Sequence, residues 1–191
     1  MNRRNYLKNF FFLGGLTILP LSIYEWLEVN NPLSENVFLS KKAIISELVE
    51  LIIPVTDTPG AKAAHVEDYV IRVMSNCNNA RQQHIFLSGI ENLENITSQT
   101  LGRTFIECTL LEKQRLLENI SKKEGSNSNF FTKVKVKFWG QSFFSKLRDL
   151  TVEGYCISLL GSTQGLAYDY IPVSYESCVM LKPKQKTWAT K

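Results

Sequence analysis

Residues 40–61 read SKKAIISELVELIIPVTDTPGA and carry the clearest structural signal in the chain. Apolar residues recur at helical spacing over 44–53, which predicts a helix with one broad apolar face. Ser40 can cap the start of this helix, and Pro54 stops it. The segment therefore predicts one core helix that ends abruptly at a turn.

The turn that follows is rich in residues that restrict or relax the backbone. Pro59 fixes one dihedral angle and Gly60 is expected to adopt a positive φ, so the chain can reverse sharply. Asp57 is expected to accept hydrogen bonds from the amides that follow it, with a catalytic role as the alternative. The residues of this motif are Pro54, Thr56, Asp57, Thr58, Pro59 and Gly60.

Three further segments with helical apolar spacing follow the turn, at residues 66–74, 85–96 and 110–120. Thr109 and Glu112 have the spacing of a capping-box pair, in which each residue satisfies a backbone amide of the other. This pair predicts that the third of these helices begins next to Thr109.

The sequence beyond residue 125 gives a mixed signal. Residues 132–138 alternate Lys and Val, which is compatible with a short strand or with a segment that leads into the next helix. Helical spacing resumes over 139–150. Thr151 can cap one more helix, which is expected to end at Gly161.

The charge distribution argues against a nucleic-acid partner. The 191 residues include 22 Lys and Arg and 18 Asp and Glu, a formal net charge of +4. The excess of cations lies in the first eight and the last ten residues, so the body between them is slightly acidic. A nucleic-acid-binding domain carries its positive charge on the folded face.

The N-terminus has the layout of an export signal. Arg3, Arg4, Tyr6, Leu7 and Lys8 precede an apolar run of about a dozen residues. Paired arginines followed by an aromatic residue, Leu and Lys are typical of the twin-arginine route to the periplasm. The run is shorter than the roughly 18 residues of a membrane-spanning helix. It can nevertheless stay attached as a membrane tether; the alternative is a basic amphipathic N-terminus or short anchor.

The predicted fold class is therefore all-α. A single helical domain is expected over 40–167, preceded by the twin-arginine signal segment over 1–26 and followed by an extended C-terminal arm over 168–191. The arm contains aromatic and apolar side chains without a helical or strand period. Tyr and Trp are favoured as anchors of protein interfaces, so the arm is expected to pack on a partner; the alternative is that it wraps its own helices.

The chain contains no recognisable catalytic motif. It lacks a Gly-x-Gly-x-x-Gly fingerprint, a phosphate-binding loop and a Gly-x-Ser-x-Gly elbow. His65 is expected at a helix start and His84 on a polar helix face, and neither has a patterned carboxylate beside it. We therefore expect no catalytic, cofactor-binding or metal-binding residues in this chain.

The four cysteines are too far apart in sequence for a Cys-x-x-Cys pair. Cys77, Cys108 and Cys156 are expected to be small buried residues, and a metal or iron–sulfur site built from all four is the alternative. Cys178 lies in the polar arm and is expected to be accessible. It is placed where an intersubunit disulfide could form after export.

Three segments follow one another in an order that matches a known family. They are residues 48–61 (LVELIIPVTDTPGA), 150–158 (LTVEGYCIS) and 168–179 (YDYIPVSYESCV). With the twin-arginine start, they resemble the gluconate 2-dehydrogenase subunit 3 family, the small subunits of membrane-bound flavin-dependent sugar and polyol dehydrogenases. The sequence departs from the family pattern at several positions. Cys156 and Ile157 replace Tyr and Thr, Leu159 stands where Glu is frequent, and Val173 and Ser177 replace glycines.

The resemblance implies a division of labour. A large subunit of the glucose–methanol–choline type would bind FAD and oxidise the sugar, and a cytochrome c subunit with haem c would take the electrons. The small subunit would have no cofactor, bind the large subunit and supply the signal for the twin-arginine translocase. A stand-alone exported or membrane-tethered helical binding protein is the alternative, and an enzyme in its own right ranks third. Partner-binding candidates are Tyr155, Tyr168, Tyr170, Pro172, Tyr175 and Cys178.

Overall fold

The computed structural model describes residues 31–125, 140–171, 178, 180 and 183–189. Within these residues the regular structure is helical, with one isolated bridge between Ala167 and Trp188 and no named strand. The all-α prediction is confirmed for this part of the chain. The predicted signal segment and the alternating residues 132–138 lie outside it. The elements are α2 (Glu35–Ser40), α3 (Lys42–Ile52), α4 (Val66–Asn76), α5 (Ala80–Leu101), α6 (Leu110–Gly125), α8 (Phe143–Ile157) and the π-helix η1 (Gly161–Gly165).

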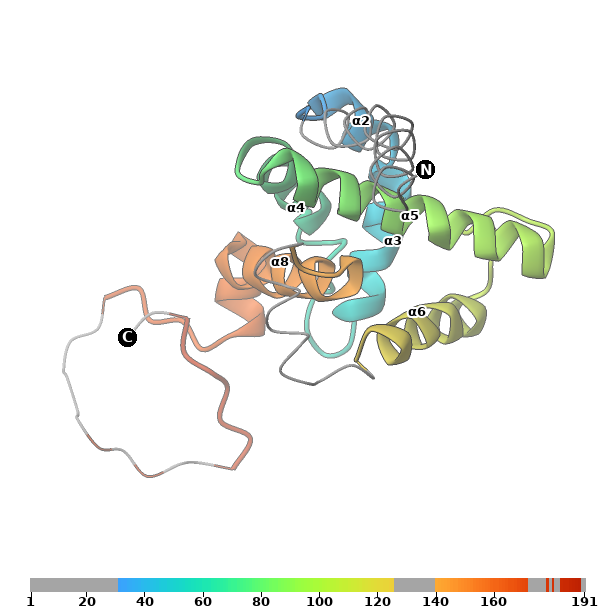
Figure 1. Cartoon of the computed structure of the whole chain (residues 1–191). Helices are drawn as coiled ribbons and strands as arrows, with labels where there is room; N and C mark the ends of the chain where they lie inside the picture. Colours follow the sequence, from blue (N-terminus) through green and yellow to red (C-terminus); the bar gives the residue numbers. More distant parts are fainter. Residues whose placement is uncertain (1–30, 126–139, 172–177, 179, 181–182, 190–191) are drawn as a thin grey trace, which may run out of the picture.

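Helix α8 lies at the centre of the helical body. It contacts α3, α4, α5, α6 and η1, and Figure 1 shows it next to these elements. The apolar faces of these helices meet in one continuous core, as expected when each amphipathic helix buries its apolar face against the others. Fully buried core residues include Phe38, Ile45, Leu48, Val49, Val70, Met74, Phe86, Ile90, Leu93 and Leu147.

The contact between α5 and α8 depends on aromatic packing. The rings of Phe86 and Phe143 are 5.3 Å apart between centroids and inclined at 60°, an edge-to-face arrangement. Gly89 lies directly beneath the Phe143 side chain, and a methyl group at this position would overlap the ring. Gly89 therefore permits the close approach of the two helices.

The predicted start of the first helix is wrong. Ser40 is the last residue of α2, and its hydroxyl donates to the carbonyl of Val37 at 2.7 Å instead of capping α3. Lys41 separates the two helices. The short α2 has little intrinsic stability, but it places Phe38 in the core, and tertiary packing supplies most helical stability in proteins. The predicted end before Pro54 is confirmed, because α3 ends at Ile52.

The two helices predicted over 139–150 and from Thr151 onward are a single helix. Helix α8 continues through Thr151, which is fully buried and donates its hydroxyl to the carbonyl of Leu147 at 2.7 Å. A threonine that bonds to the preceding turn of its own helix has no need to cap a new one. Gly161, the predicted helix end, is the first residue of η1.

Helices α4, α5 and α6 confirm the remaining predictions. The backbone amide and the hydroxyl of Thr109 both donate to the Glu112 carboxylate at 2.8 Å. Half of the predicted capping box therefore forms at the start of α6, because the Thr109 hydroxyl is a donor to the carboxylate and not the expected acceptor of the Glu112 amide. Helix α5 has 22 residues but is amphipathic. In the described part of the chain, no helix combines the length and apolar character needed to cross a membrane.

The cysteines are free thiols, and Cys77 and Cys156 are not buried as predicted. Cys108 is buried and Cys178 exposed, as expected, and Cys156 is half-buried. Cys77 is exposed, because it caps the C-terminal end of α4, where the helix leaves the core.

Candidate functional site at the turn after α3

The turn over 54–61 connects α3 to α4 and is held by its own backbone at both ends. The amide of Ala61 donates to the carbonyl of Ile53 at 2.9 Å, which closes the turn, and the amide of Thr56 donates to Thr58 at 3.1 Å. Ala61 is fully buried, whereas Val55 projects into solvent. The turn therefore has an anchored base and an exposed tip.

Glu50 in the last turns of α3, and not Asp57, organises the turn. The Glu50 carboxylate accepts the amide of Val55 at 3.0 Å and the amide of Lys62 at 2.9 Å. Asp57 instead accepts a hydrogen bond from the hydroxyl of its neighbour Thr56 at 3.0 Å, so the predicted bonds to the following amides are wrong. The sequence analysis did not single out Glu50. The signal that could have found it is a single acidic residue among the apolar residues at the end of a helix that stops at a proline.

Gly60 is required for space and not for a left-handed backbone. The glycines with positive φ in the described residues are Gly102 and Gly140, so the predicted positive φ at Gly60 is wrong. Instead, the Glu50 carboxylate lies against the Cα of Gly60, and a Cβ at this position would overlap it. A larger residue would therefore displace the side chain that binds the amides of Val55 and Lys62.

Tyr155 joins the turn to the central helix. Its hydroxyl donates to the carbonyl of Pro59 at 2.7 Å, across 96 residues of sequence. The ring is buried, and Gly165 of η1 packs against it so closely that a Cβ would lie 2.7 Å from the hydroxyl oxygen. Two of the segments that carry the family resemblance, 48–61 and 150–158, therefore meet at this contact.

The residue before Tyr155 brings α8 against α4. A Cβ on Gly154 would lie 2.6 Å from the Tyr69 ring and 3.0 Å from Val66, so glycine allows the two helices to touch. Burial raises the pKa of the Tyr69 hydroxyl, and the neighbouring Glu153 carboxylate raises it further. Tyr69 therefore stays protonated at neutral pH and acts as a packing residue.

A network of charges connects the turn to α3 and α6. Glu47 accepts from Lys62 Nζ at 2.6 Å and from Lys113 Nζ at 2.9 Å. The hydrogen bond from Lys62 holds the pKa of Glu47 below its usual value, and the Lys113 ammonium adds to this effect. Lys113 is buried and lies 5.7 Å from the centroid of the Phe105 ring. The network stabilises the base of the turn and contains no pair of groups poised for acid–base chemistry.

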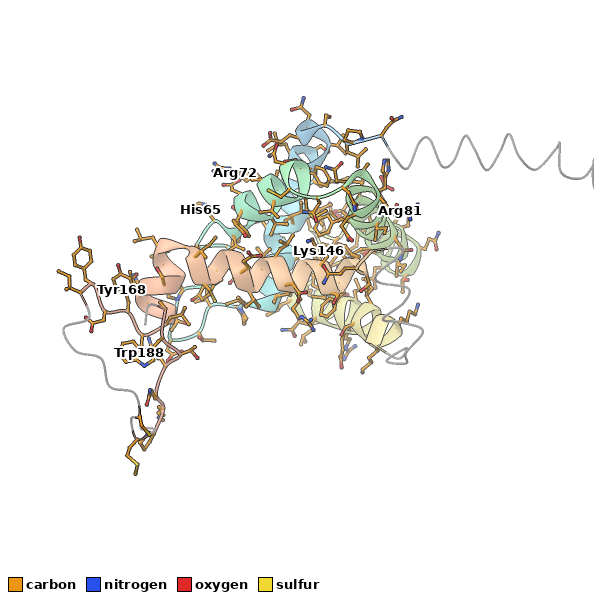
Figure 2. All side chains as sticks on the ribbon, turned by 60° about the vertical axis from the view of Figure 1, so that its left-hand side comes forward. His65, Arg72, Arg81, Lys146, Tyr168 and Trp188 are labelled. Atoms are coloured by element: carbon orange, nitrogen blue, oxygen red, sulfur yellow. The ribbon has the colours of Figure 1, made fainter. Side chains whose placement is uncertain are left out.

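An apolar surface lies beyond the C-terminal end of α8. Both ends of the described arm meet there, because the amide of Ala167 donates to Thr187 and the amide of Ala189 donates to Ala167, each at 2.8 Å. Figures 1 and 2 show these segments apart from the helical body, with Tyr168 and Trp188 beyond α8. We use the name distal apolar surface for the exposed apolar residues at the C-terminal end of α8 and in the segments that follow it: Ile157, Leu159, Tyr168, Tyr170, Ile171 and Trp188.

The structure separates the partner-binding candidates. Tyr168 and Tyr170 are exposed on the distal apolar surface, and Cys178 is exposed in the arm. Tyr155 is buried, with its hydroxyl bound to Pro59, so it positions the turn and is not a surface contact. Pro172 and Tyr175 lie outside the described residues.

The two histidines occupy the predicted elements. His65 is the N-cap residue of α4, with a left-handed backbone (φ 54°), and His84 Nε2 lies 3.1 Å from the carbonyl oxygen of Asn31. The expectation that neither histidine has a carboxylate beside it is wrong for His65. Its Nδ1 lies 3.5 Å from Glu67 Oε1, and Asp68 is the next residue along the helix.

Comparison with known proteins identifies the family. Neither the curated proteins nor the solved structures contain a significant match to this chain. The family model described as gluconate 2-dehydrogenase subunit 3 matches residues 40–173, which include the turn, the central helix and the start of the arm. The chain therefore belongs to the gluconate 2-dehydrogenase subunit 3 family.

Proposed function

We propose that this chain is the non-catalytic small subunit of a periplasmic or membrane-bound flavin-dependent dehydrogenase of sugars or polyols. It binds the large FAD subunit and directs the export of that subunit by the twin-arginine route. Family membership supports the role of a subunit in a gluconate 2-dehydrogenase-like complex. FAD belongs to the large subunit and haem c to a cytochrome subunit, so the oxidation itself takes place outside this chain.

The distal apolar surface is the observation that supports the subunit role most directly. Its members Ile157, Leu159 and Tyr170 are 64%, 78% and 82% exposed. Several large apolar side chains left exposed in one part of a chain are typical of protein interfaces, and they favour aggregation when no partner covers them. Tyr and Trp add interface area while keeping a polar atom in contact with water. We therefore assign this surface to the contact with the large subunit.

Co-purification with the large subunit tests this assignment. The test variant combines Ile157→Ser and Leu159→Ser on the distal apolar surface. The matched control combines Leu110→Ser and Leu111→Ser at the start of α6, where the exposures of 64% and 67% are similar. We expect the test variant to fold but to lose the large subunit, while the control retains it. Equal recovery of the large subunit by both variants would refute the assignment.

Export is tested separately at the N-terminus. Changing Arg3→Lys together with Arg4→Lys should leave this chain and its large subunit in the cytoplasm, because the twin-arginine translocase recognises the arginine pair. The variant should melt like the wild type, since these residues precede the helical domain. Delivery of the large subunit to the periplasm at the normal level would contradict the export role. Normal export of this chain without any associated flavoprotein would support the stand-alone binding protein instead.

A further inference from the structure

Glu67 presents an unusual buried charge at the start of α4. It is only 4% exposed, and its Oε2 atom is buried without a hydrogen-bond partner in the described residues. A buried carboxylate oxygen without a partner is costly, and native structures normally supply a donor or a bound ion. Nearby Lys42 does not fill this role, because its Nζ is 2.6 Å from the Oδ1 of Asp68.

The side chains around Glu67 form a ligand set for a cation. His65 Nδ1 lies 3.5 Å from Glu67 Oε1, and one ligand atom from each of His65, Glu67 and Asp68 lies within 4.8 Å of the others. His65 is 77% exposed and is labelled at the surface in Figure 2, so water can reach the remaining coordination positions. The cluster thus combines one buried ligand with two that can rotate.

We propose that His65, Glu67 and Asp68 bind a divalent transition-metal ion, with Zn²⁺ as the best match to the ligands. Zinc accepts imidazole nitrogen and carboxylate oxygen at about 2.0–2.2 Å, and sites with three protein ligands leave a fourth position for water. An imidazole ligand favours Zn²⁺ over Mg²⁺ and Ca²⁺, which prefer oxygen alone. The cluster closes around the ion when the exposed His65 side chain rotates and the Asp68 carboxylate exchanges its ion pair with Lys42 for the metal.

The site would fasten the loop that precedes α4 onto the first turn of that helix. His65 ends the loop with a left-handed backbone, and Val66 donates its amide to the carbonyl of Ala61 at 3.1 Å. Glu67 and Asp68 belong to the helix. An ion that links His65 to these carboxylates therefore stabilises the connection between the family turn and α4, independently of the large subunit.

Zinc titration of the full chain tests the site. The protein is freed of affinity tags and metal, and Cys77→Ser and Cys178→Ser remove the two exposed thiols from competition. We expect one Zn²⁺ per chain by calorimetry and a higher melting temperature in ZnCl₂. His65→Ala and Glu67→Gln should each weaken binding at least tenfold and abolish the thermal shift.

Two controls keep the result interpretable. His84→Ala removes the other histidine and should bind Zn²⁺ like the parent protein. The melting temperature of Glu67→Gln is measured without metal beside that of the parent, so that a loss of binding by the folded variant cannot be attributed to unfolding. Absence of Zn²⁺ binding by the parent, or equal binding by the Glu67→Gln variant, would overturn the proposal.

Discussion

Substitution of Gly60 by Ala tests how the family turn is held together. The structure gives Gly60 an ordinary negative φ but places the Glu50 carboxylate against its Cα. A methyl group at position 60 would therefore push the carboxylate away from the amides of Val55 and Lys62. The cost of the substitution should arise from these two hydrogen bonds and not from backbone strain.

The size of the effect follows from the two bonds that are lost. Hydrogen bonds to charged groups contribute about 1.5–3 kcal/mol each to stability. Because Glu50 is partly accessible, water can take the place of the lost bonds and reduce their cost. We take a loss of about 1–3 kcal/mol for the pair. Replacing glycine by alanine where the backbone allows it stabilises the folded protein by about 0.4–1 kcal/mol, because alanine lowers the conformational entropy of the unfolded chain. The expected net cost of Gly60→Ala is about 0–2.6 kcal/mol with a midpoint of about 1.3 kcal/mol, which corresponds to several degrees in melting temperature.

A double-mutant cycle with Glu50→Ala isolates this mechanism. When the carboxylate is absent, Gly60→Ala should cost nothing or stabilise the protein slightly, so the two substitutions should be strongly non-additive in urea unfolding. Gly102→Ala is the control, because Gly102 has a φ of 66° and no atom within 4 Å of its Cβ position. Its cost is pure backbone strain and should be the same in both backgrounds. An equal cost of Gly60→Ala with and without Glu50 would refute the reasoning.

Three further perturbations test other contacts. Tyr155→Phe removes the hydroxyl that donates to Pro59 and should lower the free energy of unfolding by about 0.5–1.5 kcal/mol, measured by urea unfolding. Glu47→Gln should lower the free energy of unfolding at neutral pH. The pKa of Glu47 is lowered in the folded state, so the stability that its charge provides is lost as the pH falls below about 4.3 and through the folded-state pKa. The difference in free energy of unfolding between wild type and variant should shrink over that range. A difference that stayed constant from pH 7 to pH 3 would exclude this carboxylate as the cause. Thr109→Ala removes the hydroxyl that donates to the Glu112 carboxylate and should lower the free energy of unfolding by about 0.5–1.5 kcal/mol, whereas Thr109→Ser should cost little.

The parts of the fold that could be predicted from the sequence are those with a strong local signal. Helices α4, α5 and α6 carry apolar residues at helical spacing over two turns or more, and the Thr109–Glu112 pair needs only neighbouring residues. Pro54 marks the end of α3 because proline cannot continue a helix. Each of these features is determined by residues that are close to one another in the sequence, so the local sequence pattern is enough to predict it.

The features that were missed depend on tertiary contacts. Helix α2 exists because Phe38 reaches the core, and α8 continues through Thr151 because that side chain is buried where α8 packs on the other helices. Glu50 could not be singled out because its two partners follow the end of the helix, where the backbone path decides which carboxylate meets the amides. The carboxylate beside His65 was missed for the same reason, since its burial follows from the packing of α4.

The chain keeps the family pattern at some positions and departs from it at others. These two groups of positions lie in different parts of the structure. Pro59 and Tyr155 keep the pattern, and their contact fixes the turn to the central helix. Ile157 and Leu159 replace Thr and Glu of the family pattern, and both are exposed on the distal apolar surface. Because interfaces evolve as complementary pairs, a large subunit that fits this chain should present an apolar surface opposite these residues.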